Sequence, residues 1–113
     1  MFKFSHLDKT EKEAVAEFKK LLKNSLKKDF LAVQLFGSKA RGDFNKDSDI
    51  DLIIILENAD EENKDKVFDA VMVIIDRYEL YLSVHIYSKK EYDYLNSIPT
   101  VFMQIIHKEA VAL

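Results

Sequence analysis

The sequence has 113 residues, of which 48% are hydrophobic and 33% are charged, a composition typical of one folded domain. It contains no cysteine, which excludes disulfide bonds, zinc–thiolate centres and thiol nucleophiles. The formal net charge of −3 argues against a protein that grips nucleic acid by bulk electrostatics, because that mode needs a strongly basic surface. We therefore expect a single domain over residues 1–113 that does not bind nucleic acid directly.

The first residues do not resemble a secretory signal, because Lys3, His6, Asp8 and Lys9 interrupt any apolar segment. The apolar runs elsewhere are too short to span a bilayer. We expect a cytoplasmic protein without a membrane segment.

The first half of the sequence predicts one helix and two strands. Over residues 8–29, apolar side chains recur at three- and four-residue intervals with lysine and glutamate between them, which is typical of an amphipathic helix. Residues 31–36 are apolar and end at Gly37, which predicts a buried strand. Residues 50–56 include a run of β-branched side chains and predict a strand that is covered on both faces.

The second half begins with a helix over residues 61–78, for which Asp60 is a plausible N-cap. Its apolar side chains are expected to point inward; they are Val67, Phe68, Val71, Met72, Ile74 and Ile75. Four shorter elements are expected after it: a strand over 80–87, a helix over 89–95 capped by Ser88, a helix from Ser97 and Pro99 to about residue 107, and an edge strand over 110–113. This order predicts an α/β or α+β sheet with helices packed on it.

Both glycines of the chain lie in the segment Gly37-Ser38-Lys39-Ala40-Arg41-Gly42. A strand that ends in Gly-Ser and turns into a helix exposes the first backbone N–H groups of that helix. Together with the Ser38 hydroxyl, these donors make an anion site suited to phosphate. Lys39 and Arg41 flank the turn and could contact phosphates. The alternative to an anion site is a plain strand-to-helix turn, and the alternative role of Lys39 and Arg41 is solubility.

Two carboxylates stand at the beginning of the second predicted strand. Asp49 and Asp51 are two residues apart, so a strand would point both side chains to the same face. Because like charges at this spacing repel, the pair is best explained by a hard divalent cation held through oxygen ligands. The alternative is a turn or N-cap formed by residues 47–49. The apolar run after Asp51 favours the metal site, since it holds this carboxylate at the edge of a sheet.

The combined pattern GSKARGDFNKDSDIDL resembles the signature of the minimal nucleotidyltransferases (MNT proteins) of the DNA polymerase β-like superfamily. The resemblance implies the nucleotidyltransferase fold, a small mixed sheet flanked by helices. It also implies Mg²⁺-dependent transfer of a nucleoside monophosphate from ATP or another NTP, with release of pyrophosphate. Gly37 and Ser38 would then hold the triphosphate, while Asp49 and Asp51 would be the catalytic metal ligands.

The resemblance also implies a partner. Small MNT proteins are similar to antitoxins encoded beside helical HEPN proteins, and some of them adenylylate a tyrosine of the partner and so silence a toxic RNase. This predicts an adenylyltransferase that acts on a HEPN-type protein. An exposed apolar helix surface would also allow homo-oligomers.

The sequence departs from the family pattern in one place. The family's third carboxylate lies on the following strand, where this chain has Ser83 and His85, and Glu79 would reach the site only in a shifted register. His85 is either a substitute base or a structural strand histidine. Two hypotheses therefore remain: a transferase, or a degenerate binding module that neutralises its partner by occlusion.

Overall fold

The computed structural model describes residues 7–37 and 49–113, and these contain a four-stranded mixed sheet with the strand order β3-β2-β1-β4. The strands are β1 (Phe30–Phe36), β2 (Ile50–Leu56), β3 (Leu82–Ser88) and β4 (Val111–Ala112). Strand β1 is antiparallel to both β2 and β4, whereas β2 and β3 are parallel. The edge strand expected within residues 110–113 is confirmed.

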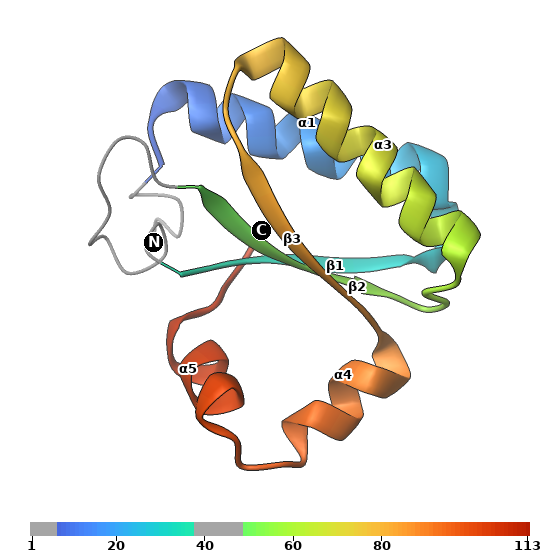
Figure 1. Ribbon diagram of the computed structural model, residues 1–113, viewed down its shortest axis with the longest axis vertical. Coiled ribbons are helices and arrows are strands. Elements are labelled where there is room, and N and C mark those ends of the chain that lie inside the picture. Colours follow the sequence, from blue (N-terminus) through green and yellow to red (C-terminus); the bar gives the residue numbers. More distant parts are fainter. Residues whose placement is uncertain (1–6, 38–48) are drawn as a thin grey trace.

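Helices cover both faces of this sheet. They are α1 (Lys9–Leu26), α3 (Glu61–Tyr78), α4 (Lys89–Asn96) and α5 (Val101–Glu109), and a 3-10 turn, η1 (Lys27–Asp29), follows α1. Helices α1 and α3 lie side by side on one face, while α4 and α5 lie on the other (Figure 1). The expected class, a small mixed sheet flanked by helices, is confirmed. Within the described ranges, no helix combines the length and apolarity needed to cross a bilayer.

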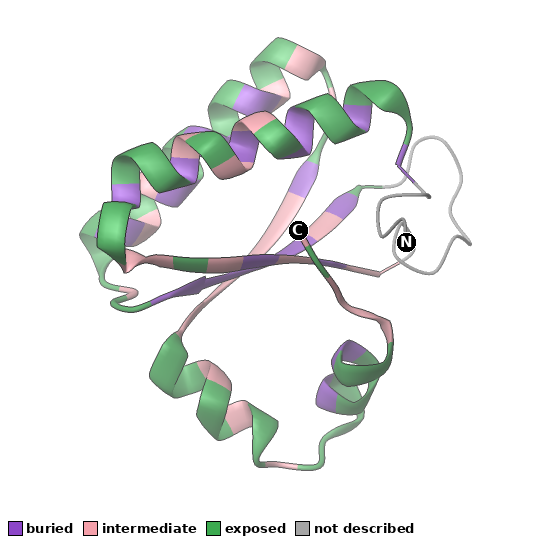
Figure 2. Cartoon of the chain, turned by 180° about the vertical axis from the view of Figure 1, so that it is seen from behind, coloured by how far each residue is buried: buried purple, intermediate pink, exposed green. Residues whose placement is uncertain are grey.

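Strand β2 runs through the centre of the molecule and is buried on both faces, as its β-branched run predicts. Leu52, Ile54 and Leu56 are fully buried in the core beneath α1 and α3. Ile53 and Ile55 point the opposite way, where they pack with Ile106 of α5. The buried residues of the two layers are visible in Figure 2. Period-2 alternation thus assigns Asp51, two residues before Ile53, to the α4/α5 face of the sheet.

Side-chain caps set the helix boundaries. The carboxylate of Asp60 accepts a hydrogen bond from the Asn63 N–H (2.9 Å), and α3 has the bounds expected from sequence. Helix α4 begins with a capping box: the Ser88 hydroxyl accepts from the Glu91 N–H, and the Ser88 N–H donates to the Glu91 carboxylate. The latter bond lowers the pKa of Glu91, because it stabilises the charged form. Local sequence therefore decides where these helices begin.

Three expectations about the second half are corrected. The last helix begins at Val101 with Thr100 as its N-cap, so Pro99 precedes the helix, and the third strand begins at Leu82. Phe68 and Met72 are not inward: they are 50% and 63% exposed. They lie about 100° around the helix from the stripe that α3 buries, because 3.6 residues complete each turn.

Candidate active site

Three of the six predicted site residues lie within the described ranges: Gly37, Asp49 and Asp51. The other three, Ser38, Lys39 and Arg41, lie outside them, as does the helix expected after Gly37. The predicted phosphate turn is therefore represented by its first residue, and the predicted metal site by both of its carboxylates.

Gly37 and Asp51 lie against each other, although fourteen positions separate them in the chain. Strand β1 ends at Phe36, which is directly opposite Asp51 in the antiparallel pair. Gly37 follows with φ of +76°, a conformation that side chains disfavour. A Cβ atom built on Gly37 would lie 2.3 Å from Oδ2 of Asp51. Only glycine therefore fits here, and its missing side chain makes room for the carboxylate.

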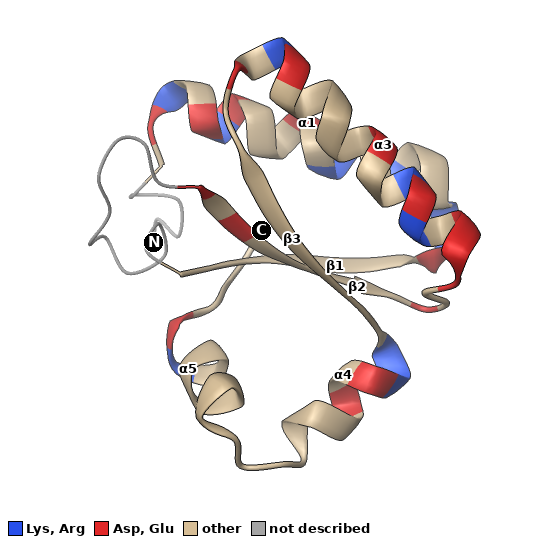
Figure 3. Ribbon diagram, viewed as in Figure 1, with Lys and Arg blue, Asp and Glu red and all other residues tan. Residues whose placement is uncertain are grey.

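The two carboxylates differ in their surroundings. Asp49 is exposed and immediately precedes β2, whereas Asp51 is its second residue and is half-buried. The Ile50 N–H between them donates to the Tyr81 carbonyl (3.1 Å), which ties the beginning of β2 to the residue preceding β3. Figure 3 shows this acidic beginning of β2 beside the termination of β1. Asp51 is thus held by the sheet, while Asp49 faces solvent.

Strand β3 offers a hydroxyl where the family resemblance predicts a third carboxylate. In the parallel β2–β3 pair, Ser83 is level with Asp51 and His85 is level with Ile53. Glu79 is the exposed C-cap of α3, four residues before Ser83, and the observed register does not bring it level with the site. The described side chains at this end of the sheet therefore offer oxygen donors: two carboxylates and one hydroxyl.

An aromatic cluster that the sequence did not reveal adjoins these donors. The rings of Phe36 and His85 meet edge to face with centroids 5.3 Å apart. Phe102 of α5 completes the cluster, 6.1 Å from Phe36 and 6.4 Å from His85. The two strand rings reach toward each other over β2, since β1 and β3 flank it. No local pattern in the sequence connects Phe36 or His85 to α5, because the three rings come from segments far apart in the chain.

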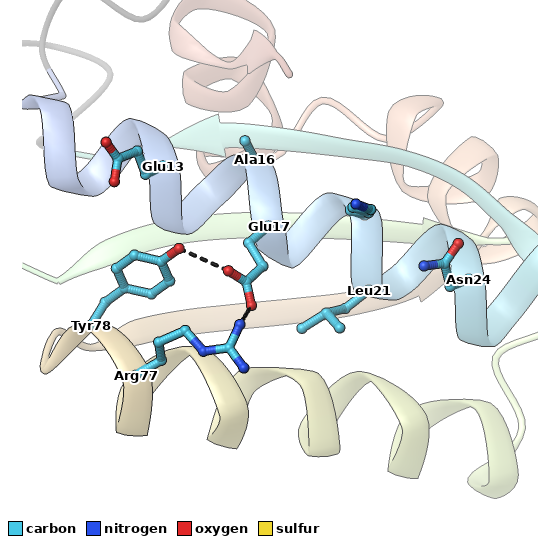
Figure 4. Close-up of a pocket in the computed structure, with 8 residues that line it drawn as sticks. Glu13, Ala16, Glu17, Leu21, Asn24, Arg77 and Tyr78 are labelled. Carbon is cyan, nitrogen blue, oxygen red and sulfur yellow. Dashed lines mark hydrogen bonds and ion pairs between the residues drawn. The ribbon is translucent and has the colours of Figure 1, made fainter.

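A separate groove of about 600 Å³ lies between α1 and α3, on the far face of the sheet (Figure 4). Three of its polar groups contact one another: the Glu17 carboxylate accepts from the Arg77 guanidinium and from the Tyr78 hydroxyl. This groove contains none of the predicted site residues. Its ion pair between Glu17 and Arg77 links helices α1 and α3.

The Nucleotidyltransferase domain family matches residues 11–111, which is most of the chain and includes the Gly-Ser turn and both carboxylates. The chain belongs to this family. Among curated proteins, a nucleotidyltransferase relative is "Putative protein adenylyltransferase MJ0141" of Methanocaldococcus jannaschii. It is 37% identical over 78 residues, which cover 68% of this chain and 79% of the relative.

Two solved structures share the fold of this nucleotidyltransferase domain. One is spectinomycin adenyltransferase AAD(9) of Enterococcus faecialis with ATP and spectinomycin, with a TM-score of 0.60, 22% identity, and coverage of 71% of this chain and 35% of that one. The other is a tri-AMPylated HEPN toxin of Shewanella oneidensis in complex with an MNT antitoxin. Its matching chain has a TM-score of 0.52 and 17% identity, with coverage of 89% of this chain and 69% of that one.

Proposed function

We propose that this nucleotidyltransferase domain transfers AMP from ATP to a hydroxyl group of a partner protein, and that it acts in this way as the antitoxin of a HEPN-type toxin. The observation that carries the proposal is the contact between Gly37 and Asp51. It brings the first residue of the phosphate-binding turn against the carboxylate of the second motif. Gly37, the first residue of one motif, therefore lies beside a carboxylate of the other at one end of the sheet.

The donors at this site suit Mg²⁺. Asp49 and Asp51 would hold the ion, and Ser83 adds a hydroxyl level with Asp51. In the part of the chain that the structure describes, no three acidic, histidine or cysteine side chains are grouped to bind a metal. Two carboxylates fit Mg²⁺, which commonly takes one or two of them and completes its octahedron with water and substrate phosphates. When bound, Mg²⁺ supplies charge neutralisation of the triphosphate.

The proposed reaction needs mainly position and charge from the protein. The acceptor oxygen attacks the α-phosphorus, and a P–O bond forms. The bond from the α-phosphorus to the bridging oxygen breaks, and pyrophosphate leaves with that electron pair; the hydroxyl proton passes to solvent or a nearby base. Gly37 and Ser38 would hold the triphosphate by backbone N–H groups, with Lys39 and Arg41 as counter-charges.

The protein acceptor and the antitoxin role are supported by the relatives. The curated relative carries the name of a protein adenylyltransferase, and one structural neighbour is a complex of an AMPylated HEPN toxin with an MNT antitoxin. The other neighbour was solved with ATP. We therefore propose ATP as the nucleotide and a HEPN-type helical protein as the acceptor.

Ser83 favours a second candidate function. A hydroxyl level with Asp51 is a weaker base and metal ligand than a carboxylate. A domain with this substitution could bind its partner without transferring AMP, and neutralise it by occlusion. This binding module would need neither metal nor nucleotide.

The test incubates the purified protein with α-labelled ATP, Mg²⁺ and the polypeptide encoded by the adjacent gene. Asp49→Asn is compared with Asp76→Asn, which alters an exposed carboxylate on α3, on the other face of the sheet. We expect Asp49→Asn to lower labelling at least about 100-fold, and Asp76→Asn to leave it unchanged. Full labelling by Asp49→Asn would remove the carboxylate pair from the mechanism.

Chelation and a neutralisation assay separate the two candidate functions. A transferase loses labelling in EDTA and regains it with added Mg²⁺. An occluding module shows no labelling under any condition, and its Asp49→Asn variant still suppresses the toxicity of the partner in cells. The transfer function is rejected if the wild-type protein binds the partner but never labels it.

A further inference from the structure

Helix α5 carries an apolar surface that the fold leaves uncovered. Its buried side chains, Met103 and Ile106, hold it to the sheet. Val101, Phe102 and Ile105 point elsewhere and are 72%, 40% and 41% exposed. We call these three residues the α5 surface. Ile105 lies four positions after Val101 and three after Phe102, so it adjoins both and the three side chains form one continuous side of the helix.

The α5 surface is continuous with the candidate active site. The Phe102 ring belongs to the surface and also contacts the rings of Phe36 and His85. Phe36 is directly opposite Asp51 in the β1–β2 pair. An apolar path therefore runs from the exposed side of α5 through Phe102 to the strand position that carries the carboxylate.

The arrangement of layers favours this side for an incoming macromolecule. Asp51 belongs to the α4/α5 face, while α1 and α3 cover the other face of the sheet (Figure 1). An acceptor hydroxyl that reaches Asp51 therefore approaches from the face of the sheet that carries α4 and α5. The α5 surface is also free of charge, because the basic side chains of this helix, His107 and Lys108, lie in its last turn, and Figure 3 shows most of the helix without Lys, Arg, Asp or Glu. It suits an apolar polypeptide segment better than a triphosphate, which needs cations or N–H donors.

We propose that the α5 surface docks an apolar segment of the acceptor polypeptide and so brings its hydroxyl to the site. The proposal rests on the transfer function proposed above and adds where the acceptor binds. A second apolar pair, Phe68 and Met72 on α3, is equally exposed but lies on the other face. It has no continuity with Asp51 and provides a matched control.

The experiment compares the double variants Val101→Gln/Ile105→Gln and Phe68→Gln/Met72→Gln, with circular dichroism and thermal melting to verify folding. The acceptor probe is the polypeptide encoded by the adjacent gene. We expect the α5 variant to raise the KM for this polypeptide about 10-fold or more, since roughly 55 Å² of lost apolar burial suffices. The KM for ATP should not change, and the α3 variant should behave as wild type.

Three outcomes would overturn the proposal. An α5 variant with an unchanged KM for the polypeptide would exclude docking at this surface. A rise in the KM for ATP alone would assign the surface to the nucleotide base. A change in oligomeric state by sedimentation, with acceptor affinity unchanged, would assign it to a second copy of the chain.

Direct binding keeps this test independent of catalysis. The affinity of the same polypeptide is measured by calorimetry without ATP for the wild type and both double variants. If the wild type transfers no AMP, the transfer function fails. Weaker binding by the α5 variant alone would then still support docking, and equal binding by all three proteins would reject it.

Discussion

Gly37 shows how a single backbone conformation can connect two motifs. Its φ of +76° turns the chain away from β1, and the absence of a side chain leaves space for the Asp51 carboxylate. The same position thus serves two purposes: it opens the segment expected to bind phosphate, and it allows a carboxylate to lie beside that segment.

We predict that Gly37→Ala damages the site more than the fold. The new Cβ would meet Oδ2 of Asp51 at 2.3 Å, so the carboxylate must move. Strain from the positive φ should lower the free energy of unfolding by about 1–2 kcal/mol. Urea unfolding measures the stability, and labelling with α-labelled ATP measures the site.

Ala32→Gly is the matched control for this prediction. It weakens the same strand by about 1 kcal/mol through chain entropy, at a position away from Asp51. We expect this control to keep transfer activity at a similar loss of stability. Equal labelling by Gly37→Ala and the wild type would show that the close approach of Gly37 and Asp51 is unimportant.

At the scale of elements, helices α1 and α3 are joined by a polar clamp as well as by their apolar faces. Glu17 of α1 accepts from the Arg77 guanidinium and from the Tyr78 hydroxyl, the latter at 2.8 Å (Figure 4). The Glu17 side chain is only 23% exposed, whereas that of Arg77 is 58% exposed. A partly buried carboxylate with two donors is worth more than an ordinary surface pair.

We predict that Glu17→Ala lowers the free energy of unfolding by about 1–2 kcal/mol, because a charge-assisted hydrogen bond is lost and the Tyr78 hydroxyl loses its acceptor. The comparison is Asp93→Ala, which breaks the exposed pair with Lys89 on α4. That change should cost at most about 0.5 kcal/mol. Urea unfolding of both variants checks the difference, and equal losses would mean that the clamp adds nothing to the packing of α1 on α3.

The whole molecule has two unequal layers. Most of the buried apolar residues lie between the sheet and helices α1 and α3, whereas the core beneath α4 and α5 contains Ile53, Ile55 and Ile106 (Figure 2). Helix α4 is anchored by Tyr92, whose hydroxyl donates to Gln34 of β1. Burial raises the pKa of this hydroxyl. The proposed active site therefore lies on the face of the sheet that has fewer buried apolar residues.

We predict that α5 opens more readily than the rest of the fold. Its backbone amides should exchange with deuterium at least about 10-fold faster than those in the centres of α1 and α3, because it buries fewer apolar side chains. Hydrogen exchange followed by mass spectrometry measures this directly. Equal protection of the two layers would contradict it.

The local features of this protein follow from short stretches of its sequence. Capping residues and apolar periodicity set the bounds of α3 and the beginning of α4, and the β-branched run set β2. These features depend on neighbours within one or two turns, or on alternation within one strand. The last helix was misplaced because Ser97, Pro99 and Thr100 compete as starting signals, and only its observed cap decides among them.

Which distant residues meet depends instead on how the strands pair and how the helices pack. The antiparallel β1–β2 register brings Asp51 opposite Phe36 and against Gly37, and the parallel β2–β3 register makes Ser83 level with Asp51. Strand register depends on hydrogen bonds between distant segments, so no local pattern reveals it. The contact of Phe102 with the strand aromatics likewise joins segments that are distant in the sequence, and the exposure of Phe68 and Met72 depends on which side of α3 packs on the sheet.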